Sequence, residues 1–154
     1  MTELNSCIFE SNIAAATLLL ENGADINAKY GVGVRPISAA INSDNPSTLQ
    51  FVIEQGADVN IDNGSPLLET IDYCIDGMIQ NNQVKLYPEA LKMLEILLEN
   101  GANLELRDEN GERPIDVITR YAEDDTAWLE RLKSLFRTVI PQIDELLKTK
   151  HNKK

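Results

Sequence analysis

Apolar residues recur along this chain with the spacing of amphipathic helices, and one apolar run returns three times with the same ending. Each run closes on a Gly-Ala pair followed by Asp or Asn. The aligned segments are Leu-Leu-Leu-Glu-Asn-Gly-Ala-Asp-Ile-Asn ending at Asn27, Phe-Val-Ile-Glu-Gln-Gly-Ala-Asp-Val-Asn ending at Asn60, and Ile-Leu-Leu-Glu-Asn-Gly-Ala-Asn-Leu-Glu ending at Glu105. A glycine after such a run is typical of a helix that ends in the left-handed conformation. The pattern therefore predicts a repeated helical unit.

A proline follows each of these glycines and sets the phase of the repeat. The prolines stand in Arg35-Pro36-Ile37, Ser65-Pro66-Leu67 and Arg113-Pro114-Ile115. Proline is favoured in the first turn of a helix, and the Asn, Asp and Gly residues before it favour tight turns. Successive glycines are 33 and 45 residues apart, at Gly23, Gly56 and Gly101. We therefore expect two helices joined by a turn in each unit, with 12 additional residues in the middle one.

The additional residues fall at about 76–90. We expect them to lengthen the helix after Pro66 and to add a polar connection at 81–83 before a new helix at Pro88. Insertions in repeat proteins usually map to loops on one face, which is often the binding face. The alternative is a protrusion without a role, which a stack of repeats tolerates.

Both ends of the chain have the pattern of caps. Helices are expected at 2–10, 13–22, 114–122 and 126–149. Pro141 should kink or divide the last of these. Covering the apolar end of the stack is the ordinary role of a terminal helix pair, and a groove for a partner is the alternative. Residues 1–149 are therefore expected to form one domain, followed by a disordered basic tail at 150–154.

The spacing and its two landmarks resemble the ankyrin repeat, a unit of about 33 residues with a β-turn and two antiparallel helices. The resemblance runs from about Ile13 to Tyr121. It implies a mainly α fold, an ankyrin-repeat α-solenoid with short β-hairpin turns and about four helix pairs including caps. Where the family has Thr-Pro-Leu-His, this chain has Arg-Pro-Ile-Ser, Ser-Pro-Leu-Leu and Arg-Pro-Ile-Asp, so looser hairpins are expected. Glu69 replaces a residue that the family buries, so the helix around it is expected to be rotated or locally unusual.

Charge is distributed unevenly along the chain. The net charge is −11, and the last seven residues hold four of the 14 basic residues. The body through Leu147 therefore has 10 basic residues against 25 acidic ones, a net charge of −15. Such a surface repels nucleic-acid phosphates and anionic lipid and attracts a basic partner. Solubility alone is the other interpretation.

Few side chains offer catalytic or ligand-binding chemistry. The one histidine, His151, lies in the basic tail, so we expect no Ser/His/Asp or Cys/His arrangement. Residues 31–34 are too short a glycine pattern for a phosphate loop. A partial calcium-loop pattern runs from Asp58 to Glu69, but Asn63 stands where that loop needs glycine. The sequence therefore predicts no catalytic residue, no metal and no cofactor.

The remaining composition bears on the compartment. Cys7 and Cys74 are too few and too far apart for a disulfide framework or a zinc site, and both are expected to be buried. Every apolar run is shorter than the ~20 residues of a membrane-spanning helix. The N-terminus lacks the basic and apolar regions of a signal peptide. We therefore expect a cytoplasmic protein.

Ankyrin proteins bind partners through the hairpin tips and the first helix of each pair, and the resemblance implies the matching positions here. These positions are Val32, Val34, Asn42, Asp62, Asn63, Asp72, Tyr73, Asp76, Glu109, Asn110, Glu112, Arg120 and Tyr121. Tyr73 and Tyr121 share one column of the repeat and would supply contact area at low entropic cost. Packing against the next repeat is their other possible role. The carboxylates nearby would speed the association of a basic partner.

The chain looks like the small stand-alone ankyrin proteins that bacteria use as immunity factors against polymorphic toxins. This likeness implies a binder and neutraliser of a basic protein, monomeric when free and without affinity for nucleic acid or membranes. A general adaptor or regulatory scaffold is the alternative. An enzyme with an unrecognised site is the third class, because a fold by itself does not exclude activity.

Overall fold

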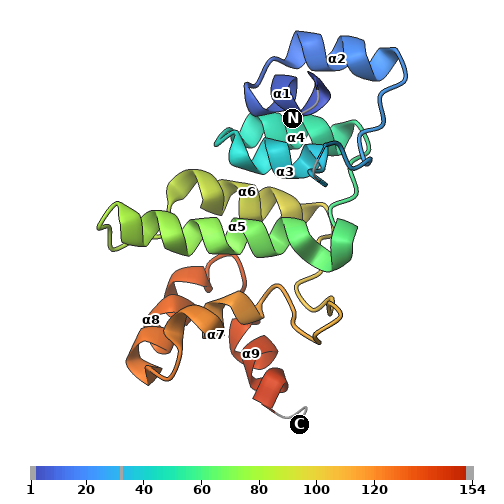
Figure 1. Ribbon diagram of the computed structural model, residues 1–154. Helices are drawn as coiled ribbons and strands as arrows, with labels where there is room; N and C mark the ends of the chain where they lie inside the picture. The colour runs from blue at the N-terminus through green and yellow to red at the C-terminus, as the bar shows by residue number, and fades with distance from the viewer. Residues whose placement is uncertain (1–2, 32, 152–154) are drawn as a thin grey trace.

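The computed structural model describes residues 3–31 and 33–151, and nearly all of their regular structure is helical. The helices, in chain order, are α1 (Glu3–Phe9), α2 (Ile13–Glu21), α3 (Pro36–Asn42), α4 (Pro46–Glu54), α5 (Ile61–Gln80), α6 (Pro88–Glu99), α7 (Asp116–Ala122), α8 (Thr126–Phe136) and α9 (Ile143–His151). The prediction of a mainly α fold is therefore confirmed. Figure 1 shows the helices stacked in pairs from the N-terminal to the C-terminal end, with α9 beside the last pair.

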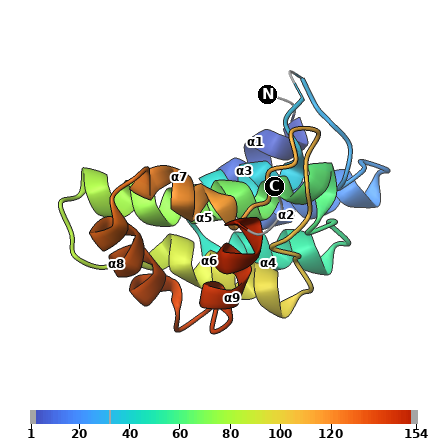
Figure 2. The ribbon, with the colours of Figure 1, turned by 90° about the horizontal axis from the view of Figure 1, so that it is seen from below.

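The first helix of each pair lies in one row. In this first-helix row α1 packs against α3, α3 against α5 and α5 against α7, whereas α4 packs against α6 in the second row. Seen from below (Figure 2), the described residues of the connection between α2 and α3, 22–31 and 33–35, project from the same end of the pairs as the connection 100–115. The connection 81–87, which belongs to the predicted insertion, projects from the opposite end. The two ends of α5 are therefore flanked by different loops.

Helix α5 shows why the first-helix row forms. It buries an apolar stripe at helical spacing, which comprises Leu67, Ile71, Cys74, Ile75 and Met78. The opposite side carries Asp72 and Asp76, and Ile79 follows three residues later on the same side. The amphipathic pattern therefore determines which side of α5 enters the core and which remains available to solvent.

The turns before α3, α5 and α7 differ from one another. Tyr30 and Val34 form an isolated β-bridge with N···O distances of 2.9 and 3.1 Å, the one bridge found among the described residues. The connection before α7 has no such bridge, but it holds backbone bonds from the amide of Asp108 to the carbonyl of Glu112 at 2.9 Å and from the amide of Gly111 to the carbonyl of Asp108 at 3.0 Å. The shorter turn at the start of α5 instead places the three residues 62–64, which lie within the bounds of that helix, in the left-handed conformation. Of the expected hairpins, the structure thus shows one with a bridge and two without.

An asparagine braces each unit against the next. The side chain of Asn27 donates to the carbonyl of Gly56 at 3.0 Å and accepts from the amide of Asp58 at 2.8 Å. Asn60, which is 33 residues further on, makes the same pair of bonds to the turn at 101–103, at 3.1 and 2.7 Å. The two aligned asparagines therefore hold two successive turns in the same way.

The C-terminal helices agree with the prediction in outline. The expected helix at 126–149 is divided into α8 and α9 on either side of Pro141, because a proline inside a helix removes a backbone bond and clashes with the preceding turn. Helix α7 begins at Asp116, two residues later than predicted, because Pro114 and the next residue form a turn. Helix α9 continues through His151, and the rest of the predicted tail, 152–154, lies outside the described residues.

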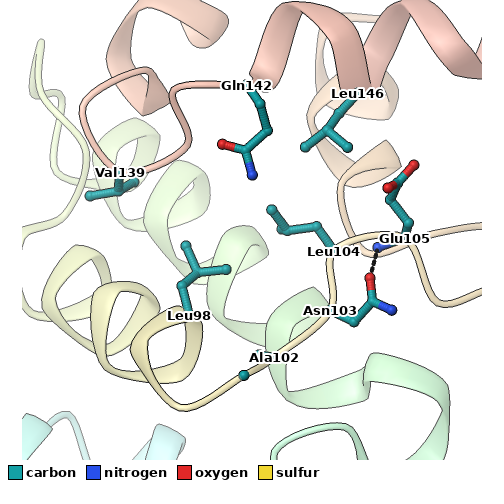
Figure 3. A pocket seen from close by; sticks show the side chains of 9 residues that line it. Leu98, Ala102, Asn103, Leu104, Glu105, Val139, Gln142 and Leu146 are labelled. Atoms are coloured by element: carbon teal, nitrogen blue, oxygen red, sulfur yellow. Dashed lines mark hydrogen bonds between the residues drawn. The ribbon is translucent and has the colours of Figure 1, made fainter.

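A cavity of about 470 Å³ lies between α6, the turn at 101–105 and α9. Figure 3 shows Leu98, Leu104 and Leu146 around it, with Gln142 pointing into it from the start of α9. The side chain of Asn103 is turned to its own loop, where it accepts from the amide of Glu105 at 2.9 Å. The cavity marks the junction between the stack and its C-terminal helices.

The two cysteines occupy different environments. Cys74 is fully buried, as predicted, and burial raises the pKa of its thiol above the ordinary range. Cys7 is only half-buried, which contradicts the prediction. It belongs to α1 at the end of the stack, where residues of α1 and α2 line an apolar cavity of about 410 Å³. No helix in the described ranges is both long enough and apolar enough to traverse a bilayer.

Candidate functional site

Hydrogen bonds between side chains link the first-helix row across its solvent side. The hydroxyl of Tyr121 on α7 donates to Asp72 Oδ1 on α5 at 2.7 Å. The hydroxyl of Tyr73, also on α5, donates at 2.8 Å to Oδ1 of Asp44, a residue of the turn between α3 and α4. We call the surface formed by Asp44, Asp72, Tyr73, Asp76, Tyr87 and Tyr121 the tyrosine–aspartate face. It contains four of the predicted binding residues, Asp72, Tyr73, Asp76 and Tyr121.

Asp44 is the centre of one half of this face. Its second oxygen, Oδ2, accepts from the hydroxyl of Tyr87 at 2.7 Å, so one carboxylate holds two phenols. The rings of Tyr73 and Tyr87 are tilted by 40°, with their centroids 5.1 Å apart. The carboxylate also raises the pKa of the Tyr87 hydroxyl, because a phenolate beside it would be repelled. Both phenols therefore stay neutral, and the negative charge of Asp44 is held at a fixed position near solvent.

Gly77 makes the contact with Tyr87 possible. A Cβ at position 77 would lie 2.8 Å from Tyr87 Cβ and 2.9 Å from its Cγ, closer than real side chains approach. The amide of Tyr87 also donates to the carbonyl of Cys74 at 3.2 Å. The insertion therefore folds back on α5 immediately after its loop, and this places the Tyr87 hydroxyl beside Asp44.

The other half of the face lies between α5 and α7. Asp72, Val117, Arg120 and Tyr121 line a shallow cavity of about 310 Å³. Partial burial and the bond to Asp72 both raise the pKa of Tyr121, with burial the larger cause. Asp76, one helical turn after Asp72, accepts from Gln80 Nε2 at 2.7 Å. Two carboxylates, Asp72 and Asp76, and one arginine, Arg120, thus lie in or beside this half of the face.

Glu69 explains how a charged residue is tolerated where an apolar one was expected. Its carboxylate accepts from the hydroxyl of Ser38 on α3 at 2.7 Å and from that of Ser65 at 3.1 Å. Burial between the helices raises the pKa of Glu69, and the two serine hydroxyls oppose that shift. The Glu69 carboxylate is thus directed at serines, and Asp58 bonds the amide of Asn60 in its own turn. The two ends of the partial calcium-loop pattern therefore serve separate local contacts.

The predicted binding residues divide into two sets. Asp72, Tyr73, Asp76, Arg120 and Tyr121 belong to the tyrosine–aspartate face or border it. Other predicted residues lie elsewhere. Asn42 bonds its own helix, and Asn63 is exposed at the left-handed start of α5. Glu109 and Asn110 are exposed in the connections, where Val34 and Glu112 are half-buried. Asp62 is not free, because Arg35 binds it at 2.9 Å. Val32 lies outside the described residues.

Asp44 and Tyr87 are two members of the face that the sequence did not indicate. Asp44 has a left-handed backbone, with φ of 62°, in the turn before α4. That conformation is compatible with an aspartate in a tight turn, and it gives no sign of distant partners. Tyr87 precedes Pro88 at the end of the insertion. Their contact joins residues 43 positions apart, so only the folded chain reveals it.

Comparison with known proteins adds no family to this description. A scan against models of protein families finds none that matches the chain, and a search of curated proteins finds no relative. The functional argument therefore rests on the geometry and charge of the tyrosine–aspartate face.

Proposed function

We propose that this chain is an ankyrin-type protein-binding module whose tyrosine–aspartate face binds a basic partner protein. The observation that carries the proposal is a group of carboxylates on and beside α5, two of which are held by phenols: Asp72 by Tyr121, and Asp44 by Tyr73 and Tyr87. Side chains fixed in this way lose little conformational entropy when a partner binds. The face is therefore suited to recognition of a second protein.

The ankyrin assignment draws support from the repeated arrangement. Helix pairs follow one another with their first helices in one row, and the Asn27 and Asn60 braces recur 33 residues apart. The position of the next brace holds Glu105, whose carboxylate instead contacts Arg113 at 3.2 Å. This change coincides with the start of the C-terminal helices, as a terminal repeat would require.

The chemistry of the face favours a basic protein over other partners. Tyrosine is enriched in the residues that dominate protein interfaces, and flanking carboxylates raise the association rate of a basic partner. The same negative charge opposes binding to nucleic-acid phosphates and anionic lipid. We therefore infer a neutralising role of the immunity type, in which one basic protein, such as a toxin, is held by this face.

The test begins with a tagged pull-down from a lysate of the source organism, washed at low and high salt. The partner so identified is then titrated against two variants with the same change of net charge. One carries Asp72→Asn and Asp76→Asn, which keep the side-chain size, and the control carries Glu21→Gln and Glu99→Gln on exposed helix ends. We expect the face variant to bind about ten-fold more weakly at low salt, and the control to change by less than about two-fold.

Other outcomes would contradict the proposal. Equal weakening by both variants would show that net charge alone drives binding and that the face has no special part. A complex that does not weaken as salt rises would remove the electrostatic argument. Several weak partners with no stoichiometric complex would favour an adaptor over a neutraliser.

A further inference from the structure

The insertion creates an apolar pocket beside the tyrosine–aspartate face. The pocket has a volume of about 360 Å³ and lies between the end of α5 and the connection 81–87. Its walls are Gly77, Met78, Gln83, Val84, Lys85, Leu86, Tyr87 and Pro88. Tyr87 belongs to both sites, because its side chain lines the pocket while its hydroxyl bonds Asp44.

Large apolar side chains at this end of α5 are left in water. Val84 is 69% exposed and Ile79 is 49% exposed, and both lie within the insertion. Exposed apolar area beside a pocket is a common mark of an interaction site. The insertion therefore offers an apolar surface where a protrusion without a role would be expected to be polar.

On its α5 side the pocket is bordered by negatively charged side chains. Asp44 keeps its carboxylate at the hydroxyl end of Tyr87, and each carboxylate oxygen can accept more than one hydrogen bond. Asp76 lies one residue before Gly77, on the exposed side of the same helix. Lys85 stands on the loop side of the pocket. A basic group of a partner would therefore be attracted to Asp44 and repelled from the loop side.

We propose that the pocket and Asp44 together bind an extended segment of the partner, with a large apolar side chain and a basic side chain two residues apart. Gly77 lies against the Cβ end of the Tyr87 ring and Asp44 against its hydroxyl end, so the two subsites are separated by the length of one ring. Side chains i and i+2 of an extended strand lie on the same side, about 6.6 Å apart, a comparable separation. This inference rests on the proposed function and specifies the partner that the face selects.

The test uses three synthetic 12-residue peptides, each labelled for fluorescence anisotropy. The first repeats Leu-Ser-Arg-Ser three times, which puts leucine and arginine on the same side of an extended strand. The second repeats Leu-Arg-Ser-Ser, which has the same composition and charge but puts them on opposite sides. The third repeats Ser-Ser-Arg-Ser and has no apolar residue. We expect the first peptide to bind about ten-fold more tightly than either of the others, because only it fills both subsites.

Two variants of the protein locate this preference. Val84→Ser, at an exposed position that the fold does not depend on, should abolish the advantage of the first peptide and leave the third unchanged. Asp44→Asn should weaken all three about equally. Lys85→Ser should strengthen all three slightly, because it removes a like charge.

The outcomes separate this inference from the function it rests on. Equal affinity of the first and second peptides, or an advantage that survives Val84→Ser, would overturn the pocket and leave an acidic face that binds basic chains. Failure of all three peptides to bind the wild-type protein at low salt would overturn the inference, whereas the proposed function is decided by the salt-dependent complex and its Asp72→Asn, Asp76→Asn variant.

Discussion

Two Arg-Pro-Ile segments stand at equivalent places in the chain and have opposite environments. Arg35 binds Asp62 between two turns at 2.9 Å, with the two side chains 20% and 37% exposed. Arg113 binds Asp116 at the same distance, but those side chains are 0% and 2% exposed. Arg113 also donates to the carbonyl of Leu146, so α9 covers the pair. The comparison shows that one local motif can serve as a surface contact or as a buried anchor, depending on what packs over it.

The largest expected effect comes from removing the buried arginine. Arg113→Ala should lower the free energy of unfolding by about 3–5 kcal/mol, because the buried carboxylate of Asp116 would lose the positive charge that faces it. Arg35→Ala should cost much less, because its pair with Asp62 is reached by water. Urea denaturation of the two variants measures both values, and equal losses would contradict the comparison.

The packing of α9 over Arg113 and Asp116 can be weakened without changing the arginine. Ile143 in α9 is fully buried, so Ile143→Ala should lower the free energy of unfolding by about 2–4 kcal/mol. Leu18→Ala serves as the control, since Leu18 is 59% exposed at the opposite end of the stack and should cost less than about 1 kcal/mol. The double variant Ile143→Ala with Arg113→Ala should lose less stability than the sum of the two single losses, because each change weakens the packing of α9. Strict additivity would show that α9 does not cover the anchor.

The carboxylate of Glu69, which lies between helices of the first-helix row, should make the protein less stable as the pH rises. Burial raises the pKa of Glu69, so the native state holds this proton more tightly than the unfolded state. The charged form therefore costs stability as the pH rises through the native pKa. Glu69→Gln should raise the free energy of unfolding at pH 7 by less than about 1 kcal/mol. The gain should vanish below the ordinary pKa of 4.5, which denaturation curves at several pH values would test.

The exposed pair of Arg35 and Asp62 should have the smallest effect on stability. Its pH dependence should have the opposite sign to that of Glu69. The bond to Arg35 lowers the pKa of Asp62, so the pair contributes stability above the ordinary pKa of 3.8 and loses it as the pH falls through the lowered value. Because the pair is exposed, Asp62→Asn should cost only about 0.3 kcal/mol at pH 7 and low salt. High salt should remove the difference. A loss that persists in 1 M salt would mean that the contact is not mainly electrostatic.

Local sequence was sufficient to predict much of the helical stack. Glycine and proline mark where helices end and begin, so α3 begins at Pro36 and α6 at Pro88, whereas Pro66 lies inside α5, which begins at Ile61. The insertion also lengthened α5 as its apolar spacing predicted. Where the turn itself contains the proline, as at Pro114, the boundary shifted by two residues.

The candidate site was less accessible to prediction. Position in the repeat identified Asp72, Tyr73 and Tyr121, because those positions do not belong to the core of their own unit. It also selected Asp62, whose carboxylate is already paired with Arg35. It missed Asp44 and Tyr87, because a turn residue and a residue before proline carry no mark of the partner they will contact.

The sequence alone determined the helical units, their order and the acidic charge of the surface, since apolar spacing, caps and turns act over a few residues. Only the tertiary structure decided which carboxylates meet which phenols, which of two identical Arg-Pro-Ile segments is buried, and where the insertion comes to lie. The contacts of Asp44 and Asp72 join residues 29, 43 and 49 positions apart. Such contacts depend on how the units pack, and the packing is the sum of many weak apolar contacts that no single segment contains.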